Sequence, residues 1–312
     1  MLKERNLLAV KLISSHIILP IVLSIASYFI NGEAYLFYST SQTVLCIIFL
    51  AGYWEFIGRR FRLIFCLFIE LVLITSLILK LSLAVPSHTE LYLVMVFGLM
   101  QLYFLLVLVR IIFVVFEKSK SAIEILFPFK NGKFLITDGG NSKISRMMNY
   151  HYYSPVHQKH NTNCSMLFAT DIVKIEVSKF KFMCASNEEY PIYGEKVYSP
   201  VNGIVLKIVN DIDDNKPYSG NYPYNTGNTI VIRQDNYYFL LGHLRKGSIW
   251  VNSGSVVKAG DLIAEAGNSG MSERPHIHIQ LIQSDTENFR KGIGVSIQFK
   301  RKNLYKNRII QV

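Results

Sequence analysis

The sequence predicts an N-terminal bundle of about four transmembrane α-helices, followed by a C-terminal all-β domain. Four apolar runs, roughly 8–30, 36–57, 63–84 and 91–116, each reach the ~20 residues that cross a hydrocarbon core. The composition then changes at about residue 117, where charged residues become frequent. The rest of the chain alternates apolar and polar positions between turns rich in Gly and Asn, which is typical of short strands.

The four apolar runs predict a multi-pass membrane region over residues 1–116. The segments "CIIFLAGYWEFIG" and "LVMVFGLMQLYFLLVLV" are apolar around the whole helix, as lipid-facing segments are. The first run is the weakest, because Lys11, His16 and Pro20 interrupt it. It is too long for the apolar region of a cleaved signal peptide and lacks a small-x-small cleavage site.

We divide the remaining chain into a charged linker, 117–135, and a β-domain, 136–312. Within this domain "KVYSPVNGIVLKIV", "GNTIVIRQDNYYFLLGHL", "SVVKAGDLIAEAG" and "HIHIQLI" read as short strands separated by turns. The four cysteines are divided between the apolar runs (Cys46, Cys66) and the β-domain (Cys164, Cys184), so they do not form a disulfide framework.

The formal net charge of +11 is typical of proteins that bind an anionic partner. The sequence has no basic helix and no aromatic-basic stripe, so we expect no nucleic acid partner. A basic surface beside a membrane instead fits anionic lipid or an anionic wall polymer.

Two histidines, His276 and His278, stand one residue apart in "PHIHIQL". In a strand they share one face, while Ile277, Ile279 and Leu281 share the other. A buried strand face rarely needs two rings that titrate near neutrality, whereas a metal site does. The pair therefore predicts a zinc site, with structural histidines as the plain alternative.

The motifs upstream follow a distinctive order. "GEKVYSPVNGIV" carries Gly203 at a turn, "LLGHL" carries His243, and "VVKAGDLIAEAGNSG" precedes the His-x-His pair. Over about residues 190–281 this order resembles the lysostaphin/LytM-type zinc metalloendopeptidase family, which cleaves peptide cross-links in bacterial peptidoglycan. The resemblance implies a β-domain like a duplicated hybrid motif with antiparallel sheets, a bound Zn²⁺ ion and peptidase activity.

The resemblance also implies roles for single residues. Asp171, in "LFATDIVKI", and His278 match two zinc ligands of the family. His243 and His276 match its two catalytic histidines, which orient or deprotonate the water and stabilise the oxyanion. "DGGNSKISRMMNYHYYSP" contains a family-like Asn-x-His, which implies His151 as the third ligand.

The third ligand is where this chain departs from the commoner family pattern. That pattern places a zinc-binding histidine four residues before the aspartate, and here the position is Leu167, which cannot bind metal. Besides His151, the residues His157, His160 and Cys164 are alternatives on the same stretch.

We expect a membrane-anchored zinc metalloendopeptidase that acts on Gly- or Ala-containing peptides, most simply peptidoglycan cross-links. One alternative is a catalytically degenerate relative that binds and activates another hydrolase. Leu167 favours that alternative, whereas retention of four histidine and aspartate positions opposes it. Another is a peptidase for a cytoplasmic or secreted peptide precursor. A biotinyl or lipoyl carrier is opposed by the lack of a modifiable lysine tetrapeptide.

Two arguments predict the side of the membrane on which the β-domain lies, and they disagree. One uses the charges of the loops and the other uses the family resemblance. Basic residues precede the first run, fill the second connection and follow the fourth run, whereas the connections "NGEAY" and "PSHTE" contain none. With four helices this pattern places both termini inside. A wall hydrolase must lie outside, as happens if only three helices span, and we expect the extracellular side.

Overall fold

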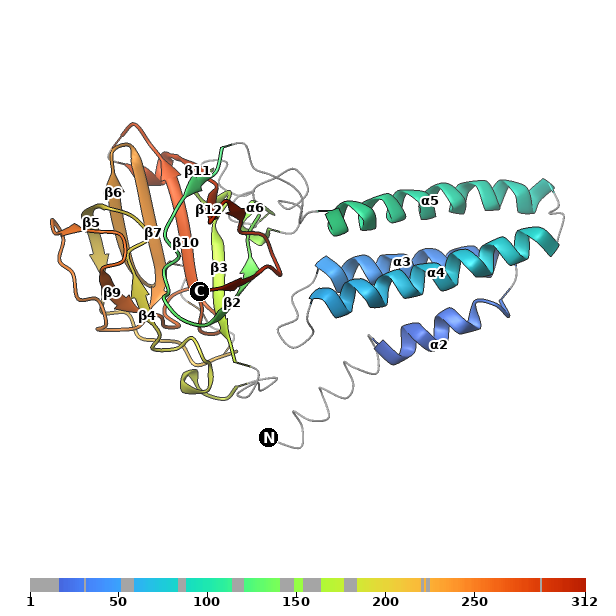
Figure 1. Cartoon of the computed structure of the whole chain (residues 1–312), viewed down its shortest axis with the longest axis horizontal. Helices are drawn as coiled ribbons and strands as arrows, with labels where there is room; N and C mark the ends of the chain where they lie inside the picture. The colour runs from blue at the N-terminus through green and yellow to red at the C-terminus, as the bar shows by residue number, and fades with distance from the viewer. Residues whose placement is uncertain are drawn as a thin grey trace. The chain divides into compact units, whose positions relative to one another are not determined.

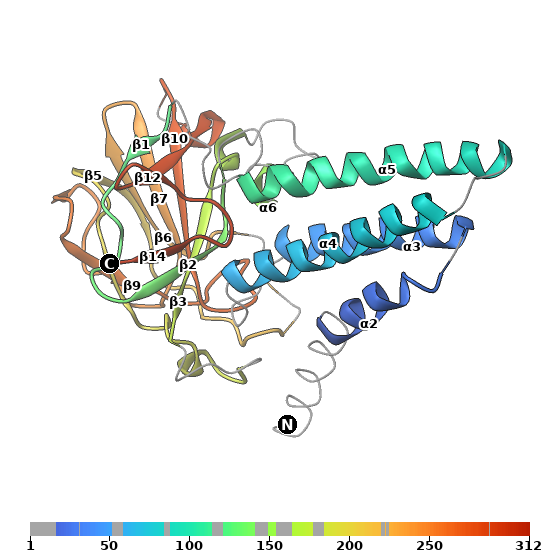
Figure 2. The same cartoon turned by 45° about the vertical axis from the view of Figure 1, so that its right-hand side comes forward.

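The computed structural model describes eleven stretches of the chain: 17–30, 32–51, 59–83, 88–113, 121–140, 149–153, 164–176, 184–219, 222, 225–286 and 288–312. The chain divides into two compact units, Met1–Phe116 and Glu117–Val312. The first is helical and the second consists mainly of β-strands (Figures 1 and 2).

The helices of the N-terminal unit are α2 (Leu19–Ala26), α3 (Gly32–Ala51), α4 (Arg59–Leu83) and α5 (His88–Phe113). Within α4, Phe61–Lys80 is long and apolar enough to cross a membrane. Ala34–Leu50 and Gly98–Phe113 are apolar but shorter. Four helices therefore occupy the apolar runs, while a bundle of four membrane spans stays a prediction. Lys11 and His16 lie outside the described residues.

The strands of the C-terminal unit form three sheets. The largest has nine strands, in the order β14-β2-β3-β10-β7-β6-β5-β8, with β11 paired to β10. The others are β1-β12-β13 and β4-β9. In chain order the strands are β1 (Ile123–Glu124), β2 (Lys133–Asp138), β3 (Thr170–Ile175), β4 (Lys196–Tyr198), β5 (Gly203–Val209), β6 (Asn228–Gln234), β7 (Tyr237–Leu244), β8 (Val256–Val257), β9 (Leu262–Glu265), β10 (Ile277–Gln283), β11 (Ile293–Val295), β12 (Ile297–Phe299), β13 (Lys302–Asn303) and β14 (Ile309–Gln311).

This β-rich unit agrees with the predicted fold class, with one difference in strand direction. The strand pairs of the described residues are antiparallel, except that β1 pairs with β12 in parallel. The exception is possible because β1 and β12 lie far apart in the sequence, and a parallel pair needs a long connection.

The predicted linker, 117–135, also differs from the structure where it is described. Its residues include β1 and the start of β2, and Ile125, Phe127 and Phe129 are buried in the main core. Charged residues and Pro128 concealed the alternation of these three apolar side chains, which buries one face of an extended segment. The described part of this stretch therefore belongs to the β-domain.

Strand β10 is buried on both faces. Ile277, Ile279 and Leu281 enter the main core, as their alternation predicts, and each contributes on the order of 1.5–3 kcal/mol by leaving water. On the other face His278 is 2% exposed and Gln280 is 4% exposed. A second apolar cluster covers the far end of this face, formed by Val231, Tyr238, Leu240, Ile282 and Phe289. His278 therefore begins a covered row rather than a solvent-exposed one.

Candidate metal centre

Strand pairing brings Asp171 of β3 opposite His278 of β10. His278 Nδ1 lies 2.9 Å from Asp171 Oδ1. On the other side of β10, Gly242 of β7 is the partner of His278. A Cβ atom at Gly242 would lie 3.0 Å from the Thr226 carbonyl oxygen and 3.7 Å from the His278 Cβ. A glycine therefore suits this crowded position beside the histidine.

His151 reaches the same aspartate from the short helix α6 (Tyr150–Tyr153). Its Nε2 lies 3.0 Å from Asp171 Oδ2. Asn149 holds this turn, because its Oδ1 accepts the His151 N–H (2.9 Å) and its Nδ2 donates to the carbonyls of Gly140 (3.0 Å) and Ala169 (3.4 Å). The asparagine of the Asn-x-His pattern thus fixes the turn by hydrogen bonds, and this turn points His151 toward Asp171.

The donor set of His151, Asp171 and His278 fits a zinc ion. One ligand atom from each lies within 4.8 Å of the others, and the side chains are largely buried. Zinc in hydrolases takes three such nitrogen and oxygen ligands at about 2.0–2.2 Å and keeps a fourth position open. His278 Nε2 lies 3.4 Å from Gln280 Oε1, and the tautomer that donates to this oxygen has an Nδ1 lone pair that could bind a metal ion.

His243 and His276 lie beside these groups, and each has one ring nitrogen fixed by a backbone carbonyl. His243 Nδ1 donates to the Ser269 carbonyl at 2.7 Å, and His276 Nδ1 donates to the Arg274 carbonyl at 2.9 Å. The two ring centroids are 4.6 Å apart. His276 Nε2 lies 3.8 Å from Asp171 Oδ1. Both histidines therefore keep an Nε2 lone pair for proton transfer.

His243 has a left-handed backbone conformation, with φ of +59°. Non-glycine residues adopt this region uncommonly, and such residues cluster at functional sites. Two hydrogen bonds hold it: the His243 N–H donates to the Thr226 carbonyl (2.9 Å), and the Gly267 N–H donates to the His243 carbonyl (3.0 Å). The turn that precedes the His-x-His pair thus fixes His243.

The electrostatics separate the histidines into two kinds. Burial lowers the pKa of His243 well below its ordinary value, as do the neighbouring histidines, and burial also lowers the pKa of His276. For His151, burial acts to lower the pKa, but the Asp171 carboxylate outweighs it and raises the pKa. For Asp171, burial acts to raise the pKa, but His151 and His276 hold it well below its usual range. His243 and His276 are therefore neutral at neutral pH.

The structure describes Leu167, at the usual ligand position of the family, and one of the alternatives to His151. Leu167 follows the turn of Cys164–Met166 and donates its N–H to the Cys164 carbonyl at 3.3 Å. Cys164 does not join the cluster of potential ligands formed by the described residues. His157 and His160 lie outside the described residues. His151 is thus the alternative that the described part of the chain brings to Asp171.

Sequence reasoning assigned no role to the groups that orient the site, although one of them, Asn149, begins the Asn-x-His pattern. These groups are Asn149, Gln280 and the carbonyls of Ser269 and Arg274. Asn149 and Gln280 stand two residues from a candidate ligand, a spacing that could have marked them. The carbonyls carry no signal of their own, because any residue type supplies one.

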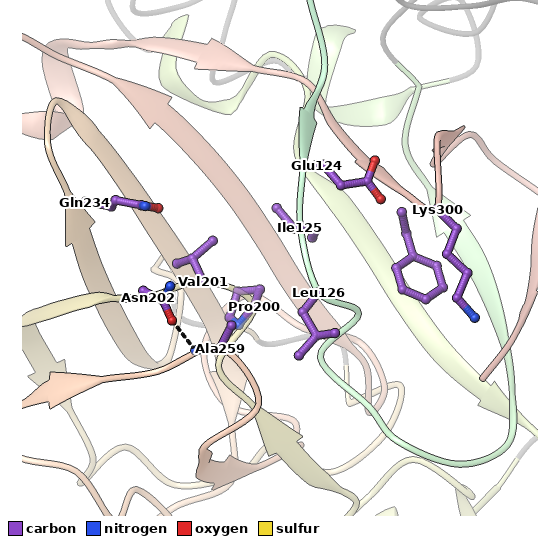
Figure 3. Close-up of a pocket in the computed structure, with 10 residues that line it drawn as sticks. Glu124, Ile125, Leu126, Pro200, Val201, Asn202, Gln234, Ala259 and Lys300 are labelled. Atoms are coloured by element: carbon purple, nitrogen blue, oxygen red, sulfur yellow. Dashed lines mark hydrogen bonds between the residues drawn. The ribbon is translucent and has the colours of Figure 1, made fainter.

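A separate open pocket of about 500 Å³ contains none of the candidate site residues. Glu124 and Lys300 lie on one side of it, while Pro200, Asn202 and Ala259 lie on the other (Figure 3). Asn202 Oδ1 accepts the Ala259 N–H at 2.8 Å and ties two turns of its wall together.

Comparison with known proteins gives one family. Residues 190–289 match the family model of peptidase family M23, a range that includes His243, His276 and His278 but neither His151 nor Asp171. The peptidoglycan DD-endopeptidase ShyA of Vibrio cholerae serotype O1 is 34% identical over 89 residues, 28% of this chain and 18% of that protein. The chain therefore spans less than a fifth of the length of this relative.

Solved structures give lower overall similarity. A zinc-containing peptidase from Vibrio cholerae is 24% identical, with a TM-score of 0.31, and the match covers 54% of this chain and 37% of that one. LytU is 28% identical, with a TM-score of 0.25 and coverage of 33% and 62%. The sequence match to peptidase family M23 lies within the C-terminal unit, over residues 190–289.

Proposed function

We propose that the chain is a membrane-anchored zinc metalloendopeptidase that hydrolyses peptide bonds in peptidoglycan cross-links. The observation that carries the proposal is the meeting of His151, Asp171 and His278 around one small volume, with His243 and His276 beside it. The family match to M23 and the relative named as a peptidoglycan DD-endopeptidase support the reaction class and the substrate class.

The residues divide the work of peptide hydrolysis among them. His151, Asp171 and His278 would hold a zinc ion, which lowers the pKa of water and polarises a carbonyl group when it is bound. Neutral His243 and His276 each present an Nε2 lone pair, and one of these two nitrogens accepts a proton from the attacking water. The same nitrogen then donates the proton to the departing amine.

Hydrolysis of purified peptidoglycan by the full-length protein tests this proposal. We expect zinc-dependent release of new amino termini by the wild type, and release at least about 10²-fold slower by His276→Gln. Asp211→Asn, at an exposed position outside the site, serves as the matched control. A wild-type protein that binds zinc at the three ligands but cleaves no cross-link would instead be the degenerate, binding-only relative.

The side of the membrane decides whether the β-domain reaches the wall. The candidate span in α4 and the wall-acting relative support an envelope location. We expect an impermeant thiol reagent to label a cysteine at Lys302, in a variant without the native cysteines, on intact cells. Labelling only after the membrane is broken would place the domain inside and exclude a wall substrate.

A further inference from the structure

The N-terminal unit contains a buried polar cluster that the proposed peptidase chemistry does not use. Gln42 and Thr43 of α3, Glu70 of α4 and Gln101 of α5 form it. Gln42, Thr43 and Glu70 are 3%, 0% and 4% exposed. Helix α3 packs against both α4 and α5, so the cluster lies where these helices meet.

Thr43 is the centre of this cluster. Gln101 Nε2 donates to Thr43 Oγ1 at 2.5 Å. Glu70 lies close enough to Thr43 for the two side chains to interact, although its carboxyl oxygens have no hydrogen-bond partner among the described residues. The Thr43 hydroxyl itself donates to the Ser39 carbonyl, at 3.3 Å. Thr43 therefore lies beside an amide group of α5 and a carboxyl group of α4.

Several buried oxygens of this cluster are unpaired within the described part of the chain. Both carboxyl oxygens of Glu70, Gln42 Oε1 and Gln101 Oε1 have no hydrogen-bond partner among the described residues. Buried polar atoms normally have partners, and an unpaired buried carboxylate is costly. A proton on Glu70 would supply one donor for four such oxygens, whereas a metal cation coordinates several oxygens at once.

Two basic residues of α4, Arg62 and Lys80, have backbone partners of their own. Arg62 donates to the carbonyls of Phe49 and Leu50, and it lies eight residues from Glu70, about 12 Å along the helix axis. Lys80 donates to the Tyr28 carbonyl at 3.2 Å. Both side chains therefore have backbone partners away from Glu70.

The geometry points to a binding site for a monovalent alkali cation, for which we name sodium, between α3, α4 and α5. Glu70 and Gln101 supply oxygen ligands around Thr43, and Gln42 lies beside Thr43 on α3. A single carboxylate balances a single positive charge, whereas a divalent ion would remain uncompensated in a buried site. Oxygen atoms alone, with no buried nitrogen or thiolate ligand required, are what such hard cations prefer.

Equilibrium binding of radioactive ²²Na⁺ to the purified full-length protein in detergent tests this site. We expect saturable binding that unlabelled NaCl displaces and choline chloride at the same ionic strength does not. Glu70→Gln keeps the shape of the side chain and removes its charge, so it should abolish binding. Thr43→Val should weaken binding at least tenfold. Asp211→Asn, which removes a carboxylate from the other unit, should bind as the wild type does.

Each outcome decides the question. A wild-type protein with no saturable sodium binding, or Glu70→Gln binding sodium as the wild type does, would overturn the site. If Glu70→Gln does not fold, as judged by gel filtration, Thr43→Val decides, and unchanged affinity in that variant would overturn the proposal. Stability that changes with pH but not with sodium would instead assign the cluster to a proton.

Discussion

Asp171 and His278 are 107 positions apart in the sequence and face each other across β3 and β10, with 2.9 Å between Oδ1 and Nδ1. Side chains alternate along a strand, so a slip of one residue in this pairing would send them to opposite faces of the sheet. The core residues Ile277 and Ile279 hold the register. The same pairing that forms the core therefore assembles the candidate metal centre.

Replacing either neutral histidine should separate turnover from metal binding. We expect His243→Gln and His276→Gln to bind zinc as the wild type does, because neither belongs to the ligand cluster. Hydrolysis should fall by about 10²–10⁴-fold, the usual contribution of a positioned acid or base. Peptide release and zinc content, measured on the same samples, check this. Loss of zinc in both variants would make these residues structural or ligating instead.

The third ligand can be assigned by single substitutions. His151→Ala should lose zinc, since its Nε2 is the nitrogen that reaches Asp171. Cys164→Ser should keep zinc, because that thiol lies outside the described cluster. Zinc content after dialysis measures both. Full zinc in His151→Ala would move the third ligand to another residue, with His157 and His160 the next to replace.

Asn149 should act by positioning His151. Asn149→Ala removes the acceptor of the His151 N–H and two donors to backbone carbonyls. Loss of a group that orients a ligand typically lowers metal affinity about 10–100-fold without abolishing binding. Competition with a zinc-binding dye measures the affinity, and Asn252→Ala, at an exposed turn, is the control. Wild-type affinity in Asn149→Ala would show that the hydrogen bonds of Asn149 do not position His151.

The strand pattern and the candidate site residues could be predicted from the sequence. The hydrogen bonds that hold those residues in place could not. The alternation of Ile277, Ile279 and Leu281 predicted their buried face, and the structure confirms it. His276, however, precedes β10, and a hydrogen bond to a carbonyl fixes it rather than strand geometry. The left-handed conformation of His243 is equally invisible in a sequence, because tertiary hydrogen bonds impose it.

The segment around His151 shows the limit of local pattern. The residues of "NYHYY" do not indicate whether the run is a strand or a turn. In the structure Tyr150–Tyr153 is a single helical turn. The carboxylate of Asp138, in β2, accepts the Tyr150 N–H at 2.7 Å, and the Ala169 carbonyl accepts from Asn149, so groups distant in the sequence fix that turn. Contacts between distant parts of the chain therefore decide its conformation.

Acidification should destabilise the metal-free protein through His243. Burial and the neighbouring histidines lower the pKa of His243 well below its ordinary value. Below about pH 6.5 the unfolded chain therefore binds a proton that the folded chain does not, and stability falls as the pH falls. Between about pH 7.5 and 5.5, His243→Gln should lose less stability than the wild type, by on the order of 1 kcal/mol. Urea unfolding in EDTA measures this, and equal losses in the two proteins would contradict it.

Zinc content of the full-length protein, measured by mass spectrometry for the wild type and for His278→Ala, tests the metal centre most directly. His278 Nδ1 is the strand-held ligand opposite Asp171. The site predicts about one zinc per chain in the wild type and almost none in the variant. Equal zinc contents in the two proteins, whether both loaded or both empty, would contradict the site.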